Sequence, residues 1–226
     1  MNETKTPAST RAVTHTINRA RPETVRLWTI QPLWVWERLY EQKTLFSNPS
    51  QLEYFSDLKD DYDWMRGQMR RRLPDYLDHY PWWAYDHKTD LRHRHTDSNR
   101  QHVRLELGVP QERVLLSAYG AWHFALNKFY LPYAVEDAEY QRESDAWDEE
   151  LEQHGLNPYS GRPLPEPWHT RMTASWERIF DVEDLRETNT IQACFERLDL
   201  EDVVKVTVFT PRPFIRNIPS SFSVCA

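Results

Sequence analysis

Arginines and aromatic residues gather in the middle of an acidic chain, and together they could bind a nucleotide. The 226 residues carry a formal net charge of -7, yet one region is rich in cations. Its basic residues are Arg66, Arg70, Arg71, Arg72, Lys88, Arg92, Arg94, Arg100 and Arg104. Guanidinium groups bind phosphate oxygens in pairs, and Trp82, Trp83 and Tyr85 could stack on a base. The pattern indicates an anion site, or else a charged face that acidic residues elsewhere balance.

A polar pair near the end of the chain could do chemistry at a cleft. Ile191, Ala193 and Phe195 alternate with other residues, as in a strand with one apolar face. Gln192 and Glu196 fall on the opposite, polar face. A carboxylate at a strand end beside a cleft can stabilise a developing positive charge. The alternative is an ordinary surface glutamate with a solvated amide neighbour.

Histidines form two further candidate groups. Trp122 and His123 follow Gly120 at the start of a predicted helix, where free N–H groups attract anions. His87, His93 and His95 lie in a polar loop spanning 86–101 and could ligate a metal. The arginines beside them oppose a cation, so we expect a solvated basic loop and no metal.

Several chemistries lack their motifs. With only five glycines, the chain contains no G-x-G-x-x-G or G-x-x-x-x-G-K-[ST] phosphate loop and no G-x-S-x-G elbow. Its two cysteines, Cys194 and Cys225, form no C-x-x-C pair, which is typical of free thiols in a reducing compartment. No stretch of about 18 apolar residues predicts a membrane span. We therefore expect a cytoplasmic protein that does not contact a membrane.

Hydrophobic periodicity predicts the elements that must position these residues. Strict alternation of Val103, Leu105, Leu107 and Val109 gives the clearest strand, and Pro32 suits the first turn of a helix. Strands are predicted at 25–30, 80–85, 102–109, 114–116, 190–196 and 203–209. Helices are predicted at 32–43, 51–73, 121–131, 136–152 and 173–180, with a loop over 154–168.

The order of these elements favours one α+β domain. Strands occur at both ends of the chain with helices between them, which suits a mixed, largely antiparallel sheet with inserted helices. Residues 24–210 are predicted to form this single domain. Residues 1–23 are polar and read as a disordered leader, and 211–226 as an irregular tail.

Several segments resemble a bacterial family of domains of unknown function. The segment Arg26-Leu-Trp-Thr-Ile-Gln-Pro32, followed by Trp36, opens the likeness. It continues through Val103–Pro110 with Val114–Ser117, Trp122-His123, Ile191-Gln-Ala193 and Leu200–Val203, in the expected order. The resemblance covers about residues 25–210 and implies no established activity.

A second resemblance is to ADP-ribosyltransferase-like folds. Those begin with a strand whose Arg or His touches NAD, followed at once by a helix, and carry a catalytic Glu on a late strand. Arg26 or Trp28 would occupy the first position here, and Gln192 or Glu196 the last. The resemblance implies that Arg26 contacts NAD, Trp28 lines the pocket, Glu196 stabilises the ribosyl cation and Gln192 orients it. Further predicted cofactor-binding residues are Thr29, Arg104, Trp122 and His123.

Two other functions stay open beside an NAD-dependent transferase of unknown acceptor. A nucleotide- or RNA-binding module would present Arg70, Arg94 and Trp83 on one exposed face. A non-catalytic protein-interaction or regulatory domain would expose a contiguous apolar patch of tryptophans. The transferase hypothesis requires Glu196 and Arg26 to face one cleft, with RNA or protein as the acceptor.

Overall fold

A computed structural model describes residues 23–48, 55–88, 100–134, 136–157, 163–185 and 190–210. The predicted leader up to residue 22 and the tail from residue 211 lie outside these ranges. So do the loop residues Arg92, His93, Arg94 and His95, and also Cys225.

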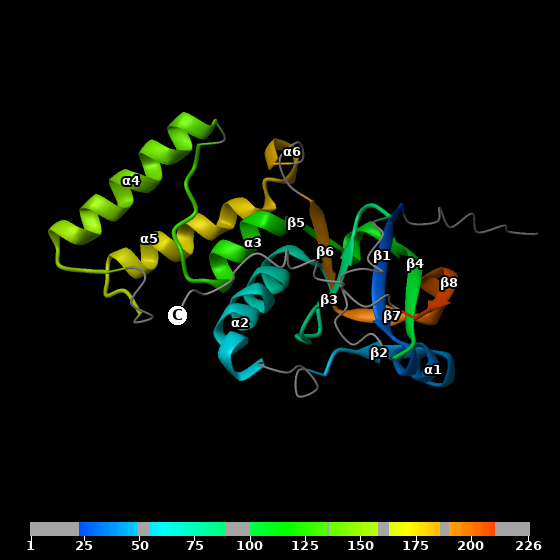
Figure 1. The fold of residues 1–226 in the computed structure, drawn as a ribbon. Helices are drawn as coiled ribbons and strands as arrows, with labels where there is room; N and C mark the ends of the chain where they lie inside the picture. Colours follow the sequence, from blue (N-terminus) through cyan, green and yellow to red (C-terminus); the bar gives the residue numbers. More distant parts are fainter. Residues whose placement is uncertain are drawn as a thin grey trace, which may run out of the picture.

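An antiparallel sheet of six strands forms the centre of the molecule (Figure 1). Its spatial order is β5-β6-β3-β1-β4-β8, and each of these neighbouring pairs is antiparallel. The strands are β1 (Thr24–Pro32), β3 (Trp82–Tyr85), β4 (His102–Pro110), β5 (Leu115–Ala118), β6 (Ile191–Phe195) and β8 (Val203–Phe209). A second, two-stranded sheet pairs β2 (Thr44–Phe46) with β7 (Arg197–Asp199). The predicted α+β class with a largely antiparallel sheet is confirmed.

Helices are inserted between the strands, as the order of the sequence patterns predicts. They are α1 (Leu33–Gln42), α2 (Phe55–Arg72), α3 (Tyr119–Leu126), α4 (Asp137–Gln153), α5 (Trp168–Ser175) and α6 (Val182–Leu185). Short 3-10 turns are η3 (Gln111–Arg113), η4 (Trp176–Phe180) and η5 (Leu200–Asp202). In Figure 1, α4 and α5 lie to the left of the sheet, away from α1 and the small sheet at the lower right. No helix of the described ranges is long and apolar enough to cross a membrane.

Two buried clusters hold these layers together. On one face of the sheet, Leu27 and Leu105 pack with Leu39 of α1, and all three are fully buried. The second cluster joins the β5–β6 end of the sheet to the helices, through residues such as Met65 of α2 and Ile179 of η4. Apolar side chains that alternate along β1 and β4 therefore meet α1, while the other helices cover the opposite end of the sheet.

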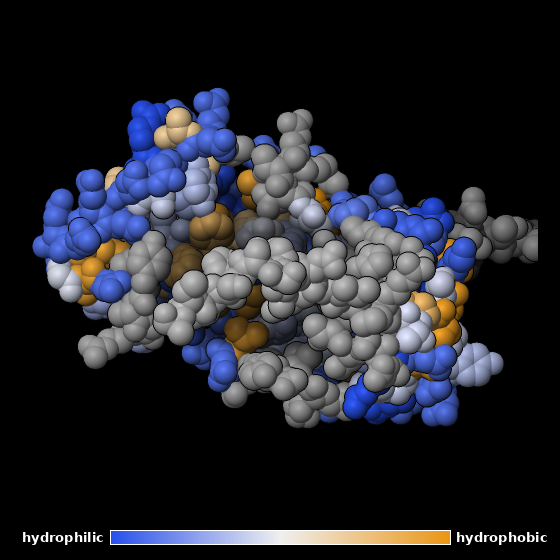
Figure 2. Space-filling view, in the orientation of Figure 1, coloured by the Kyte–Doolittle hydropathy of each residue, from blue (hydrophilic) through white to orange (hydrophobic). Residues whose placement is uncertain are grey.

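The structure differs from the predicted elements where short segments depend on distant partners. The strands β2 and β7 are three residues each and pair through Leu45 and Leu198, a contact that local periodicity does not encode. Helix α5 begins at Trp168, at the end of the predicted loop, and α3 ends at Leu126, earlier than predicted. The outer side of helix α4 is hydrophilic in Figure 2, whereas its Trp147 and Leu151 are buried.

Candidate functional site

The strand register aligns one residue from each strand in a row across one face of the large sheet. The row runs Ser117, Gln192, Tyr85, Trp28, Glu106 and Lys205, from β5 to β8. Side chains directly opposite one another on neighbouring strands point to the same face and lie within about 5.5 Å at Cβ. We call this set the cross-sheet row. It brings Trp28 and Gln192, which are far apart in the sequence, to the same level of the sheet.

A cation and a carboxylate lie beside Trp28. The Nη2 atom of Arg26 lies 2.6 Å from Oε1 of Glu106, and the Arg26 guanidinium carbon lies 5.9 Å from the Trp28 ring centroid. The Arg26 side chain is 65% exposed, so its outer N–H groups face solvent. The indole Nε1 of Trp28 is buried and has no hydrogen-bond partner among the described residues. Arg26 is therefore held over an aromatic ring and remains accessible to an anion.

Aromatic rings extend the row at the beginning of α3. The ring of Tyr85 lies 5.9 Å from Tyr119 and 6.2 Å from His87, measured between centroids. Tyr119 in turn contacts His123 edge to face at 4.6 Å. The backbone N–H of Tyr119 donates to the carbonyl of Thr190, next to the first residue of β6. The predicted residue His123 is therefore close to the row, on an exposed helical turn.

Gln192 lies at the buried end of the row. Its side-chain amide donates a hydrogen bond of 3.2 Å to the hydroxyl of Ser117, and only 4% of Gln192 is exposed. The alternative of a solvated amide at Gln192 is wrong, because β6 lies between β5 and β3 and is buried along its whole length.

Glu196 lies away from the row. Its Oε1 accepts hydrogen bonds from the backbone N–H groups of Leu77, at 2.7 Å, and His79, at 3.0 Å. Strands β1 and β6 are both antiparallel to β3 and so run parallel to each other. Arg26 precedes the row and Glu196 follows it, so a rise of about 3.3 Å per residue separates them by roughly 20 Å along the strands. Glu196 and Arg26 therefore do not face one cleft, and Glu196 caps a turn.

Two other predicted residues serve the core. Thr29 points to the face opposite the row, is 3% exposed, and donates its hydroxyl to the carbonyl of Trp83 at 2.8 Å. Trp122 is 4% exposed and packs on Trp83 and Trp64, with centroids 5.5 and 6.2 Å away. Arg104 is half-buried and faces Ile30 of β1, one step along the same face as the row. Of these three, Arg104 lies on the face of the sheet that carries Arg26, at the level of Ile30.

The arginines of α2 are paired with carboxylates of this chain. Arg66 contacts Asp63 and Asp78, and Arg70 also contacts Asp78. Arg71 and Arg72 both lie 2.5 Å from Glu177 of η4. Burial by itself would raise the pKa of the Glu177 carboxyl group, but these internal partners lower that pKa overall. The α2 part of the basic region is thus neutralised, which favours the alternative of a balanced charged face there.

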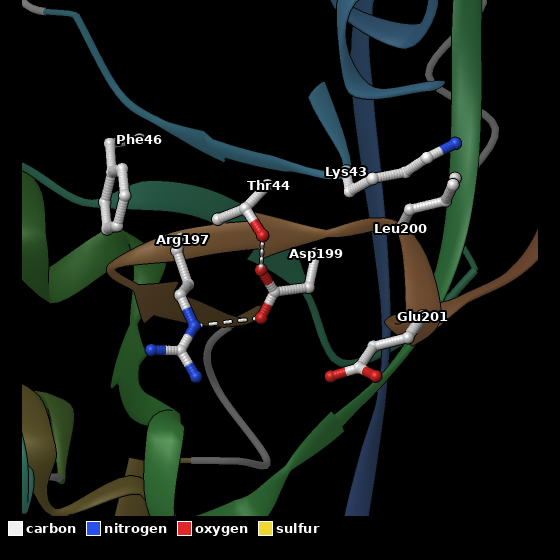
Figure 3. A pocket seen from close by; sticks show the side chains of 7 residues that line it. All are labelled: Lys43, Thr44, Phe46, Arg197, Asp199, Leu200 and Glu201. Atoms are coloured by element: carbon white, nitrogen blue, oxygen red, sulfur yellow. Dashed lines mark hydrogen bonds and ion pairs between the residues drawn. The ribbon is translucent and has the colours of Figure 1, made fainter. Parts of the chain in front are cut away.

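A cavity of about 580 Å³ beside the small sheet holds an ion cluster (Figure 3). The Asp199 carboxylate accepts hydrogen bonds from the Thr44 hydroxyl at 2.7 Å and from Arg197 Nε at 2.9 Å. Arg113 Nη2 lies 2.9 Å from Asp199 and 3.0 Å from Asp202. Burial raises the pKa of Asp202 to about 6, although Arg113 lowers it. Because Asp199 and Asp202 share the Arg113 guanidinium, the cluster serves to attach β2 and β7 to the large sheet.

Neither cysteine chemistry nor a metal site is evident in the described part of the chain. The Cys194 thiol is completely buried, and burial raises its pKa far above the usual range, so a thiolate nucleophile is not available. Within the same ranges, no group of three His, Cys, Asp or Glu residues is arranged to hold a metal ion.

Sequence reasoning missed Ser117, Tyr119 and Glu106 as neighbours of the candidate residues. The sequence suggests Tyr85 only as a residue of the basic region that could stack on a base. These residues have no distinguishing local pattern. Register alone brings them together. Other elements separate each pair of neighbouring strands of the large sheet in the sequence, so no hairpin turn fixes that register.

Comparisons with known proteins agree with the first resemblance. The model of a family described as Domain of unknown function (DUF3841) matches residues 26–204. Searches of curated proteins and of solved structures found no match. The matched range contains β1 from its third residue onward, the strands from β2 to β7 and every helix described above. The chain therefore belongs to the DUF3841 family of domains of unknown function.

Proposed function

We propose that this domain binds NAD along the cross-sheet row and transfers ADP-ribose to an acceptor with Gln192 beside the ribose. Glu196 does not face one cleft with Arg26, which the transferase hypothesis requires, so it takes no part in this proposal. The single observation that carries the proposal is the register of Trp28, Tyr85 and Gln192 in one row, with Arg26 beside it. The immediate succession of β1 and α1, at Pro32 and Leu33, also supports the likeness to ADP-ribosyltransferase-like folds.

Each residue of the row has a role that suits its chemistry. The exposed Arg26 can exchange its contact with Glu106 for the pyrophosphate, because phosphate binds guanidinium groups in two-point contacts. Trp28 and Tyr85 offer ring surfaces on which nicotinamide or adenine stacks. Gln192 replaces the expected Glu196 as the residue beside the ribose. Because Gln192 is 4% exposed and donates to Ser117, it must exchange that hydrogen bond for a ribose hydroxyl group, and as a neutral amide it supplies no negative charge.

The reaction would break the bond between ribose C1′ and the nicotinamide nitrogen, whose electron pair leaves with nicotinamide. A nucleophile of the acceptor forms the new bond to C1′ and loses its proton. Because Gln192 carries no charge, we expect slow transfer, limited by poor stabilisation of the positive charge that develops on the sugar.

Isothermal titration with NAD, AMP and nicotinamide tests the binding step. Two arginine–tryptophan pairs offer a matched comparison, since Arg38 lies 5.8 Å from the ring of Trp34 on α1, much as Arg26 lies over Trp28. We expect saturable NAD binding that falls at least tenfold in Arg26→Ala and Trp28→Ala. Arg38→Ala and Trp34→Ala should keep wild-type affinity.

Either of two results would overturn the proposal. One is the absence of heat at millimolar NAD, which would favour an RNA-binding or protein-interaction module. The other is an equal loss of affinity in both arginine–tryptophan pairs. Release of nicotinamide, measured with NAD in excess, then tests the chemical step, and Gln192→Ala should reduce it further.

A further inference from the structure

A second cavity lies among the helices, away from the cross-sheet row. It has a volume of about 420 Å³ and is lined by residues of α2, α5 and η4 and by the turn after α3. Apolar atoms of Trp64, Met172 and Trp176 form much of its wall. The polar groups that face it are Asp60, Asp61, Asn127, Lys128, His169 and Thr173.

Asp61 is a buried carboxylate on this wall. It is 2% exposed, and its Oδ2 atom has no hydrogen-bond partner among the described residues. Lys128 also lines the cavity, yet no ion pair joins it to Asp61 within 4.0 Å in those residues. Leaving a buried carboxylate oxygen unpaired is costly, so a cation entering the cavity would relieve that cost.

The aromatic wall suits a cation as well. Trp64 and Trp176 meet edge to face, with centroids 5.6 Å apart and an interplanar angle of 84°. The indole N–H of Trp176 donates to the Phe129 carbonyl at 2.7 Å, and Trp64 stacks on Phe180 at 6.0 Å. These contacts fix both rings. A cation near the face of a tryptophan is attracted by its π electrons, and more strongly where water is excluded.

We propose that this cavity binds a small organic cation, an ammonium or guanidinium compound, between the Asp61 carboxylate and the Trp64 and Trp176 rings. A long chain of methylene groups is compatible with the apolar wall at Met172. The site is separate from the proposed NAD site, and the two proposals stand or fall independently.

Proton binding to Asp61 gives the site a pH dependence. Burial raises the pKa of Asp61 to about 6, while the charge of Lys128 lowers it and that of Asp60 raises it. The carboxylate is therefore ionised above pH 6 and holds a proton below it. A cation must displace that proton at low pH, so its affinity falls about tenfold for each unit below pH 6. His169 also faces the cavity, beside Asp60 and Lys128.

Titration calorimetry with agmatine and putrescine at pH 8 and pH 5 tests the proposal, with 1,4-butanediol as an uncharged control. We expect saturable binding of one or both amines at pH 8 and at least fivefold weaker binding at pH 5. Butanediol should not bind. Asp61→Asn should abolish amine binding at both pH values. Glu149→Gln, at an exposed position of α4 outside the cavity lining, should stay within about threefold of wild type, as for a screened surface charge.

Two further variants keep the test decisive. His169→Gln should retain the pH dependence, because Asp61 carries it. If Asp61→Asn does not fold, Trp64→Leu should still weaken amine binding at least threefold. The proposal is overturned if no amine binds at millimolar concentration at pH 8, if butanediol binds equally well, or if a folded Asp61→Asn binds like wild type.

Discussion

At the residue scale, the Glu196 carboxylate fixes the turn that follows α2. It accepts two backbone hydrogen bonds, from Leu77 and His79, and is itself buried. Hydrogen bonds to a charged acceptor are among the stronger ones in a protein. These two hydrogen bonds account for the carboxylate that follows β6, and the explanation requires no role in chemistry.

Replacing Glu196 should therefore reduce stability and leave ligand binding unchanged. We expect Glu196→Ala to lower the free energy of unfolding by about 2–4 kcal/mol, because two backbone donors lose their acceptor. Glu196→Gln, which keeps one oxygen, should lose less. Urea denaturation measures the change. A variant of unchanged stability that had lost NAD binding would instead return Glu196 to the site.

Replacing Asp61 should have the opposite effect, an increase in stability whose size depends on pH. Its pKa in the folded protein, about 6, exceeds the ordinary value of 3.8, so the folded state holds the proton more tightly. Folding is therefore favoured below about pH 4 and loses that advantage as pH rises through 6. Asp61→Asn should gain about 1–3 kcal/mol over wild type at pH 8 and almost nothing at pH 4. Chemical denaturation at both pH values checks this, with Glu149→Gln, at an exposed position of α4, as the control. A gain of equal size at pH 4 would show that the charge of Asp61 is not its cause.

At the element scale, the cluster around Arg113 joins three segments. Arg113 ends η3 and contacts Asp199 of β7 and Asp202 of η5, whose side chains are only 7% and 8% exposed. The edge elements β2 and β7 are too short to be stable alone, so they depend on this attachment and on Leu45 and Leu198.

Removing Arg113 should leave two buried carboxylates without their main cation. We expect Arg113→Met to lower the free energy of unfolding by about 3–5 kcal/mol near pH 8. Arg197 touches the same Asp199 but is 37% exposed, so Arg197→Met should cost less than about 1 kcal/mol. Thermal denaturation of both variants compares them. Equal losses would mean that exposure does not control the strength of these ion pairs.

At the scale of the whole molecule, the two hydrophobic clusters are connected through β6. Ala193 belongs to one cluster and its neighbour Cys194 to the other. A strand that is buried on both faces makes the packing of one cluster depend on the other. The helical part and the α1 side should consequently unfold together.

Substitutions in either cluster test this cooperativity. Leu105→Ala and Ile179→Ala, both at fully buried positions, should each cost about 2–5 kcal/mol. Unfolding followed by tryptophan fluorescence and by far-UV circular dichroism should coincide in each variant. Val204→Ala, at a position 60% exposed, serves as a control that should change little. Two separate transitions would contradict one cooperative unit.

The sequence by itself determined the class of the fold and most of its strands. Alternation along 102–109 predicted β4 and its buried residues, because side chains on a strand point to opposite faces in turn. Pro32 predicted the change from β1 to α1 by the same kind of local reasoning. The family resemblance carried by Arg26 to Pro32 was confirmed by the match over residues 26–204.

Only the tertiary structure decided which predicted residues meet. Register between distant strands aligned Trp28 with Gln192 and separated Arg26 from Glu196, and long-range pairing follows from the packing of the whole core. Burial of Asp61 against Trp64 and Trp176 likewise arises from contacts between segments about 100 residues apart. Local patterns report which face of an element is apolar, but the partner of that face depends on the packing of the complete chain.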